Sequence, residues 1–158
     1  MKQGFRVFDA HSHIGEWGRW EMKGNEVQPF DREFLDIEDL RDYMEKYGVE
    51  RQIVMPHYHP DLSKTFELNP LAAEMSSEEN IYGAVFVEPS HPEETQEALE
   101  ISGSNEGIVA LQTSAGAWPS SYDSERWSED ERMVMEKVLE FSARNDVPIQ
   151  FHTGLSDS

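Results

Sequence analysis

The 158-residue sequence predicts an α/β fold in which helices cover a parallel sheet. Two observations carry this prediction. Short segments rich in Val, Ile, Leu and Phe alternate strictly with longer amphipathic segments, which is the pattern of consecutive β/α units. No Pro- or Gly-rich linker interrupts the alternation, so residues 1–158 are expected to form a single domain.

The first two strands are expected at 5–9 and 52–55, with an irregular, Trp-rich loop and one helix between them. Asp36 is suited to cap that helix, because its carboxylate can accept the backbone N–H groups left free at a helix start. Apolar residues then recur at helical spacing, and Gly48 supplies the left-handed conformation that ends the helix. The second strand ends at Pro56.

A weaker helix is expected over 68–75, and Asn69-Pro70 is the alternative start. The third strand covers 81–87. Ser90 and Glu93 then predict a capping box for a polar helix that reaches Ile101.

The fourth strand is expected at 108–112. After a loop rich in Ser, Gly, Trp and Pro, Ser128 and Glu131 form a second capping box, and Asn145 closes the helix that follows. The fifth strand covers 147–151. Five strands suit a doubly wound sheet or the first part of a (β/α)₈ barrel, which needs eight strands.

The chain is strongly acidic, with 13 Lys+Arg against 32 Asp+Glu and a net charge of −19. Nucleic acid and anionic membrane carry the same sign of charge, so neither is expected as a partner. The N-terminus lacks the apolar core of a signal peptide, and no stretch approaches the ~20 apolar residues of a membrane span, so a cytoplasmic protein is expected. The acidity is typical either of a well-solvated surface or of halophilic proteins, whose charges are screened by salt.

His11 and His13 give the strongest functional signal. On an extended segment, residues two apart project to the same side, so the two imidazoles can be offered to one ion where the first strand ends. The chain has no cysteine, so a metal must be held by histidines and carboxylates. The alternative is a pair of hydrogen-bonding loop histidines.

His152 directly follows the fifth strand. In an eight-stranded barrel the first and fifth strands face each other, so His152 can converge with His11 and His13 on one ion. A doubly wound sheet leaves that convergence unexplained, and no Gly-rich phosphate loop follows any strand.

Further residues are candidates for weaker roles. Trp17 and Arg19 could form an aromatic wall and a cation for an anionic aromatic or carboxylate substrate, or simply anchor their loop. His57 and His59 could contact substrate or belong to an ordinary polar loop. Asp9 could orient a metal ligand or accept backbone hydrogen bonds.

The segments FDAHSHIG at 8–15 and PIQFHTG at 148–154 resemble motifs of the amidohydrolase superfamily, in particular its aminocarboxymuconate-semialdehyde-decarboxylase-like branch. The resemblance implies a (β/α)₈ TIM barrel of the metal-dependent hydrolase type, of which this chain holds about the first five units. It also implies one divalent metal ion, zinc with manganese as the alternative, held by His11, His13 and His152.

In that family, a histidine after the sixth strand and an aspartate after the eighth complete the site, so the acid–base residues are expected beyond Ser158. The segment LQTS at 111–114 lacks the lysine that bridges two metals in some relatives, which favours a mononuclear site. The implied function is hydrolysis or non-oxidative decarboxylation of a small carbonyl or carboxylate substrate. The alternative is a non-catalytic half-barrel that associates with a second copy, as a homo-oligomer, or with a partner chain.

Overall fold

The computed structural model describes residues 6–15, 19–23, 26–30, 36–59, 61–114 and 127–152. For 19–23, 26–30, Ser114 and His152 it describes the backbone alone. Within these residues, five strands form one parallel sheet in the order β1-β4-β5-β6-β7. The strands are β1 (Val7–Ile14), β4 (Val49–Pro56), β5 (Ile81–Phe86), β6 (Ile108–Ser114) and β7 (Ile149–His152).

The order of the strands decides between the two expected folds. Apart from the β2–β3 hairpin, which forms a separate sheet, the strands lie side by side in the order in which they follow one another in the chain. A doubly wound sheet reverses this order at a switch point, whereas a barrel keeps it throughout. The sheet is therefore a curled half-barrel, as the sequence predicts.

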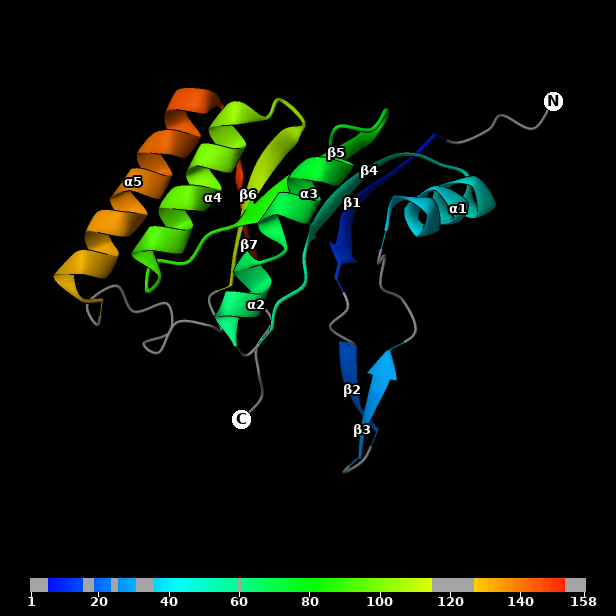
Figure 1. Cartoon of the computed structure of the whole chain (residues 1–158), viewed down its shortest axis with the longest axis horizontal. Coiled ribbons are helices and arrows are strands. Elements are labelled where there is room, and N and C mark those ends of the chain that lie inside the picture. Colours follow the sequence, from blue (N-terminus) through cyan, green and yellow to red (C-terminus); the bar gives the residue numbers. More distant parts are fainter. Residues whose placement is uncertain are drawn as a thin grey trace.

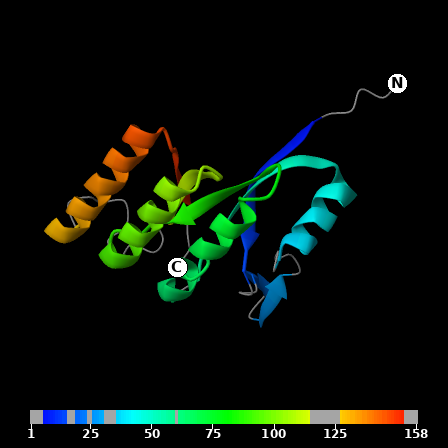
Figure 2. The same cartoon turned by 45° about the horizontal axis from the view of Figure 1, so that its top comes forward.

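The described helices are α1 (Ile37–Tyr47), α2 (Leu62–Phe66), α3 (Asn69–Met75), α4 (Pro92–Ser104) and α5 (Glu129–Asn145). Helices α3, α4 and α5 lie side by side along the outer face of the sheet (Figures 1 and 2). No described helix has the length and apolarity to cross a membrane.

Two apolar clusters bind the helices to the outer face. In one, Leu40 of α1 and Met75 of α3 pack with Val54 of β4. In the other, Val138 of α5 packs with Leu111 of β6. Burying such a side chain contributes about 1.5–3 kcal/mol, so these clusters supply much of the stability of the fold.

The inner face of the sheet carries a separate cluster built from strands alone. Met55 of β4, Ala84 of β5 and Ala110 of β6 form it, with Ile53 packed against them. Side chains alternate between the two faces of a strand, so residues in register with this cluster also point inward. His13 of β1 pairs in register with Met55 and therefore lies on the inner face.

The sheet curls far enough for its two edge strands to meet through side chains. β1 and β7 lie at opposite ends of the strand order, yet Gln150 Nε2 is 2.6 Å from His11 Nδ1. The inner face is thus concave, and the first and fifth strands of the sheet face each other across it, as in a barrel.

Two of the three predicted N-terminal helix caps are confirmed, and so is the predicted end of α1 at Gly48. The Asp36 carboxylate accepts the N–H groups of Glu38 and Asp39, each at 2.9 Å, and Gly48 ends α1 with φ 68°. Ser128 and Glu131 form the reciprocal capping box of α5.

The capping box predicted at Ser90 is wrong. Helix α4 starts later, with His91 at the N-cap position and no side-chain cap. The Ser90 hydroxyl and N–H turn instead toward Glu88 Oε1, at 3.3 and 3.5 Å, because that carboxylate is buried and needs donors.

Several predicted element bounds also differ. The first strand runs to Ile14 rather than Asp9, because pairing with β4 continues past the histidines. The helix predicted over 68–75 takes the alternative start, at Asn69, where Pro70 fits the first turn, and a separate short helix, α2, precedes it. The loop predicted after the first strand contains an antiparallel hairpin, β2 (Arg19–Lys23) with β3 (Glu26–Phe30) (Figure 1).

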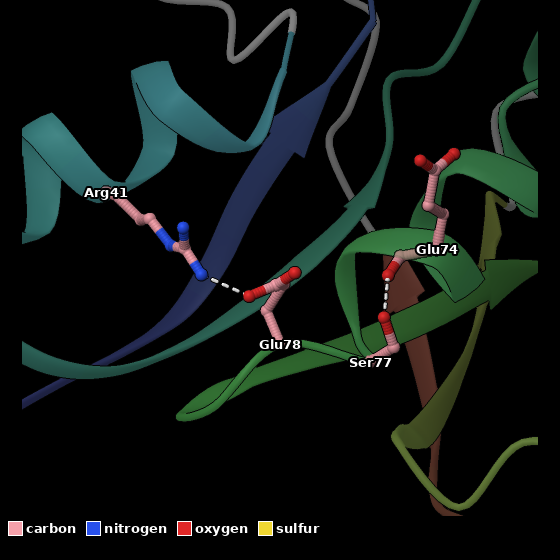
Figure 3. A network of polar contacts seen from close by, with 4 residues as sticks. All are labelled: Arg41, Glu74, Ser77 and Glu78. Carbon is pink, nitrogen blue, oxygen red and sulfur yellow. Dashed lines mark hydrogen bonds and ion pairs between the residues drawn. The ribbon is translucent and has the colours of Figure 1, made fainter.

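Some acidic side chains on the surface have basic partners. Arg41 of α1 reaches across to Glu78, which follows α3, while the neighbouring Ser77 hydroxyl donates to the Glu74 carbonyl at 2.7 Å (Figure 3). Arg6 pairs in the same way with Glu50 of β4. Exposed pairs of this kind contribute about 0–1 kcal/mol each, so they offset little of the repulsion within a net charge of −19.

We therefore expect the thermal unfolding temperature to rise steadily as KCl is raised from about 0.1 M to about 1 M. Over that range the screening length falls from ~10 Å to ~3 Å, which weakens repulsion between the surface carboxylates. Differential scanning calorimetry would measure this rise. Full stability in dilute buffer, unchanged by KCl, would contradict the halophilic interpretation.

Candidate metal centre

A β-bulge in β1 sets the direction of the two histidines. Asp9 pairs in register with Gln52, and Ser12 pairs with Val54. Between these two pairs β1 advances by three residues and β4 by two, so β1 contains one extra residue. The extra residue brings Asp9 and Ser12 to the same face although they are three apart. Bulges of this kind re-aim neighbouring side chains and are common beside active sites.

Polar contacts fix the bulge. Buried Gln52 donates from Nε2 to the Ser12 hydroxyl, and Ser12 donates to Asp9 Oδ2 at 3.0 Å. Asp9 Oδ1 accepts the backbone N–H of His11 at 3.1 Å. Asp9 thus accepts a backbone hydrogen bond, one of its two predicted roles, and through it holds the main chain that carries His11.

The two histidines converge through their outer ring nitrogens. His11 Nε2 lies 3.0 Å from His13 Nε2, and the rings stand edge to face with centroids 4.7 Å apart. The opposite nitrogens also have partners. His13 Nδ1 is 3.3 Å from the Pro56 carbonyl oxygen, and His11 Nδ1 is 2.6 Å from Gln150 Nε2.

This donor pair fits a metal such as zinc. Two nitrogens bound to one tetrahedral zinc at ~2.0–2.1 Å stand about 3.3 Å apart, close to the observed 3.0 Å. Metal-binding histidines commonly donate their other N–H to a carbonyl oxygen, as the contact of His13 with Pro56 allows. Among the side chains that the structure describes, no group of three His, Asp or Glu residues could hold a metal ion. The described residues therefore provide two candidate ligands, His11 and His13.

Of the other predicted site residues, His57 lies beside the histidine pair and His59 does not. His57 follows β4, donates its N–H to the Ile14 carbonyl at 3.2 Å, and places its ring 5.3 Å from that of His13. His59 makes local contacts, since its N–H donates to Thr65 and its Nδ1 accepts the N–H of Asp61. The structure thus brings His57 to the histidine pair, and it shows His59 bonded to the start of α2.

Three predicted site residues have side chains outside the described part of the chain. Trp17 lies wholly outside it, and Arg19 is described by its backbone in β2. The backbone of His152 pairs with Ser114 at the end of β7. Gln150 precedes it by two residues on the same strand, and that spacing gives the two positions the same face.

Glu88 is a candidate that the sequence did not single out. It follows β5, is 0% exposed, and is held by Thr95, whose hydroxyl accepts its N–H at 2.9 Å and donates to its carbonyl at 2.7 Å. A buried carboxylate at the C-terminal end of a sheet strand is typical of functional sites in this fold. In the sequence Glu88 is recognisable as the residue after a strand. Its burial depends on the packing of α4, which contributes Thr95.

The pKa of Tyr58 is raised above its ordinary value by burial of the phenol and, secondarily, by the negative charge of Glu88. The folded state therefore holds the Tyr58 proton at a pH where the unfolded chain has lost it. Stability from this group is complete below pH 10.0 and is lost as the pH rises through the folded-state pKa.

Tyr58→Phe is expected to flatten the decline in unfolding free energy at alkaline pH, and Glu88→Gln to reduce it in part. Urea unfolding at a series of pH values, with ultraviolet absorbance following phenolate formation, would measure both. An alkaline decline equally steep in the parent and in Tyr58→Phe would contradict this assignment.

Comparison with known proteins supports the fold. No family model and no curated protein matches the chain. A solved structure does: a probable 2-pyrone-4,6-dicarboxylic acid hydrolase from Acinetobacter baumannii, crystallised with citric acid bound, at a TM-score of 0.54 and 8% identity. The match covers 94% of this chain and 50% of that one, so the chain spans about half the length of its structural neighbour. At this identity the likeness shows the fold: an α/β half-barrel corresponding to part of a hydrolase barrel.

Proposed function

We propose that this chain carries the metal-binding half of a hydrolase or non-oxidative decarboxylase that acts on a small carbonyl or carboxylate substrate in the cytoplasm. The observation that carries the proposal is the 3.0 Å approach of His11 Nε2 to His13 Nε2 on the concave face of the sheet. The neighbour of matching fold, itself described as a probable hydrolase with a carboxylate-rich molecule bound, supports the same substrate class.

His11 and His13 would hold the ion, with His152 as the proposed third ligand. When bound, such an ion would lower the pKa of a water molecule at the site to about 7 and would polarise a carbonyl oxygen. The chain's own residues would prepare the site. Asp9 holds the backbone at His11, and His57, whose ring is 5.3 Å from that of His13, would meet a substrate beside the pair.

The proposal is tested with the native protein that contains these residues, by removing its metal with a chelator, restoring zinc or manganese, and measuring turnover. Two substrate classes are compared: a cyclic ester such as 2-pyrone-4,6-dicarboxylate for hydrolysis, and an aromatic carboxylic acid for release of carbon dioxide. Metal-dependent turnover of one class, lost in His13→Ala, is the expected result. Equal turnover in the metal-free and metal-loaded native protein would contradict the proposal.

A second candidate, a non-catalytic half-barrel that closes against a second copy, rests on the edge strands. In the described residues β1 pairs with β4 alone and β7 with β6 alone. Apolar side chains on these edges are open to solvent, with Phe8 55% and Phe151 43% exposed. Unpaired edges are ready templates for association.

Light scattering after size exclusion distinguishes this candidate. Association through the edge predicts a dimer or larger species in the parent chain and a shift toward monomer in Phe8→Lys. A well-folded parent that runs as a monomer at all concentrations would remove this alternative.

A further inference from the structure

Gln52 is a buried polar residue on the strand next to the histidine pair, and no sequence motif singles it out. It lies on β4 two residues before Val54, so it shares with Val54 the face of the sheet that the helices cover. Its side chain is 0% exposed. Its amide nitrogen donates to the Ser12 hydroxyl, which joins β4 to the bulge in β1.

Hydrogen-bond chemistry gives this relay a direction. The Asp9 carboxylate can only accept, so the single hydrogen of the Ser12 hydroxyl points to Asp9 Oδ2, 3.0 Å away. The Ser12 oxygen is then an acceptor toward Gln52, and the amide must turn its NH₂ end to it. Asp9 Oδ1 completes the relay by accepting the backbone N–H of His11 at 3.1 Å.

This orientation of the amide is unfavourable for the fold taken alone. The opposite end of the group, Gln52 Oε1, is buried, and within the described residues it has no hydrogen-bond partner. A buried carbonyl oxygen without a partner is destabilising, and an apolar side chain of similar size would avoid that penalty. Packing therefore does not explain a glutamine at this position. What the amide supplies is a donor to Ser12.

The bulge that this donor supports sets the direction of His11. At the bulge, Ala10 and His11 together stand opposite the single residue Ile53. Without the extra residue the register of β1 against β4 would slip by one position, and the side chains on one side of the slip would turn to the other face. A residue that holds the bulge therefore helps to hold His11 Nε2 at 3.0 Å from His13 Nε2.

We propose that Gln52 is a positioning residue of the metal centre, which acts through Ser12 and Asp9 to keep the bulge formed and His11 aimed at His13. It does so from the helix-covered face of the sheet, on the side opposite the histidine pair. For its effect on metal binding this inference rests on the proposed function, whereas the arrangement of the two rings is a property of the metal-free protein.

The first test is made without metal, on the histidine-labelled native protein that contains these residues. Gln52→Met keeps the length of the side chain and removes the amide. In the parent, the rings of His11 and His13, with centroids 4.7 Å apart, are expected to show nuclear Overhauser contacts with each other. In Gln52→Met these contacts should weaken or disappear. Contacts as strong as those of the parent would overturn the proposal.

The second test measures zinc affinity by competition with a chelator, together with the midpoint of urea unfolding. Gln52→Met is expected to bind zinc about 10–100-fold more weakly, the range typical of lost outer hydrogen bonds. Its unfolding midpoint is expected to equal or exceed that of the parent, because the buried carbonyl without a partner is removed with the amide. Parent-like zinc affinity combined with a lower midpoint would assign Gln52 a purely structural role and refute the inference.

Thr113→Val is the matched control. Thr113 lies on β6, is 0% exposed, and its hydroxyl oxygen also lacks a hydrogen-bond partner within the part of the chain that the structure describes. The substitution removes a buried polar atom from a strand that does not neighbour β1 in the sheet. Ring contacts and zinc affinity should stay at the parent values, and losses as large as those of Gln52→Met would contradict a specific role for Gln52.

The two tests separate this inference from the proposed function. A parent protein that binds no zinc would refute the proposed function, whereas the contacts between the His11 and His13 rings would still decide whether Gln52 positions them. Zinc binding in the parent with unchanged ring contacts in Gln52→Met would leave the proposed function standing and remove the role of Gln52.

Discussion

Replacing either His11 or His13 with alanine is expected to weaken zinc binding by more than about 100-fold, beyond the 10–100-fold typical of losing an outer hydrogen-bond partner. Each substitution removes one of two nitrogens that meet at 3.0 Å, and a single imidazole then remains among the described ligands. Chelator competition with the full chain measures the affinity, and circular dichroism checks that both variants remain folded.

His91→Ala is the matched control for these variants. His91 stands at the start of α4, where its Nδ1 is 3.0 Å from the Ser90 hydroxyl and its ring is 5.6 Å from that of Phe66. It is not part of the histidine pair, so zinc affinity should stay at the parent value. Parent-like affinity in both His11→Ala and His13→Ala would show that zinc binds elsewhere.

Replacing Asn69 with alanine is expected to lower the unfolding free energy by about 2–6 kcal/mol. The substitution leaves two buried backbone groups without a hydrogen-bond partner, at about 1–3 kcal/mol each. Asn69, at the start of α3, is 2% exposed. Its amide donates to the Phe86 carbonyl at 3.0 Å and accepts the Phe86 N–H at 2.7 Å. The side chain thereby extends the pairing of β5 at the end of the strand that leads to Glu88.

Asn145→Ala tests whether this cost is specific. Asn145 is exposed at the end of α5, and its side chain donates one hydrogen bond within the described residues, to the Phe141 carbonyl at 2.9 Å. Urea unfolding of both variants should show a loss for Asn145→Ala within about 0.5 kcal/mol, as for surface positions in general. Equal and small losses at the two positions would contradict the structural role of Asn69.

Local sequence signals predicted the helix ends well because each depends on one or two residues. Asp36, Gly48 and Ser128 act through hydrogen bonds or backbone angles within their own turn, so no distant contact can override them. The capping box predicted at Ser90 is wrong for the opposite reason. Its hydroxyl turns toward a carboxylate whose burial depends on the packing of the whole sheet.

The candidate site shows the same division. Spacing alone predicted that His11 and His13 share a side, and the structure places their nitrogens together. The spacing of residues in the sequence could not predict the bulge at Asp9 or the contact of His11 with Gln150, because both depend on partners in other strands. His57 and His59 have identical local signals, and only the fold separates the one beside His13 from the one bonded to Asp61.

Zinc-loaded crystals of the full chain would show whether the histidine pair is a metal centre. An anomalous difference map should contain a peak about 2.0–2.1 Å from Nε2 of both His11 and His13, the distance of a zinc–imidazole bond. Zinc bound at another place, with the two Nε2 atoms still in contact with each other, would contradict the proposed site and the metal-dependent function built on it.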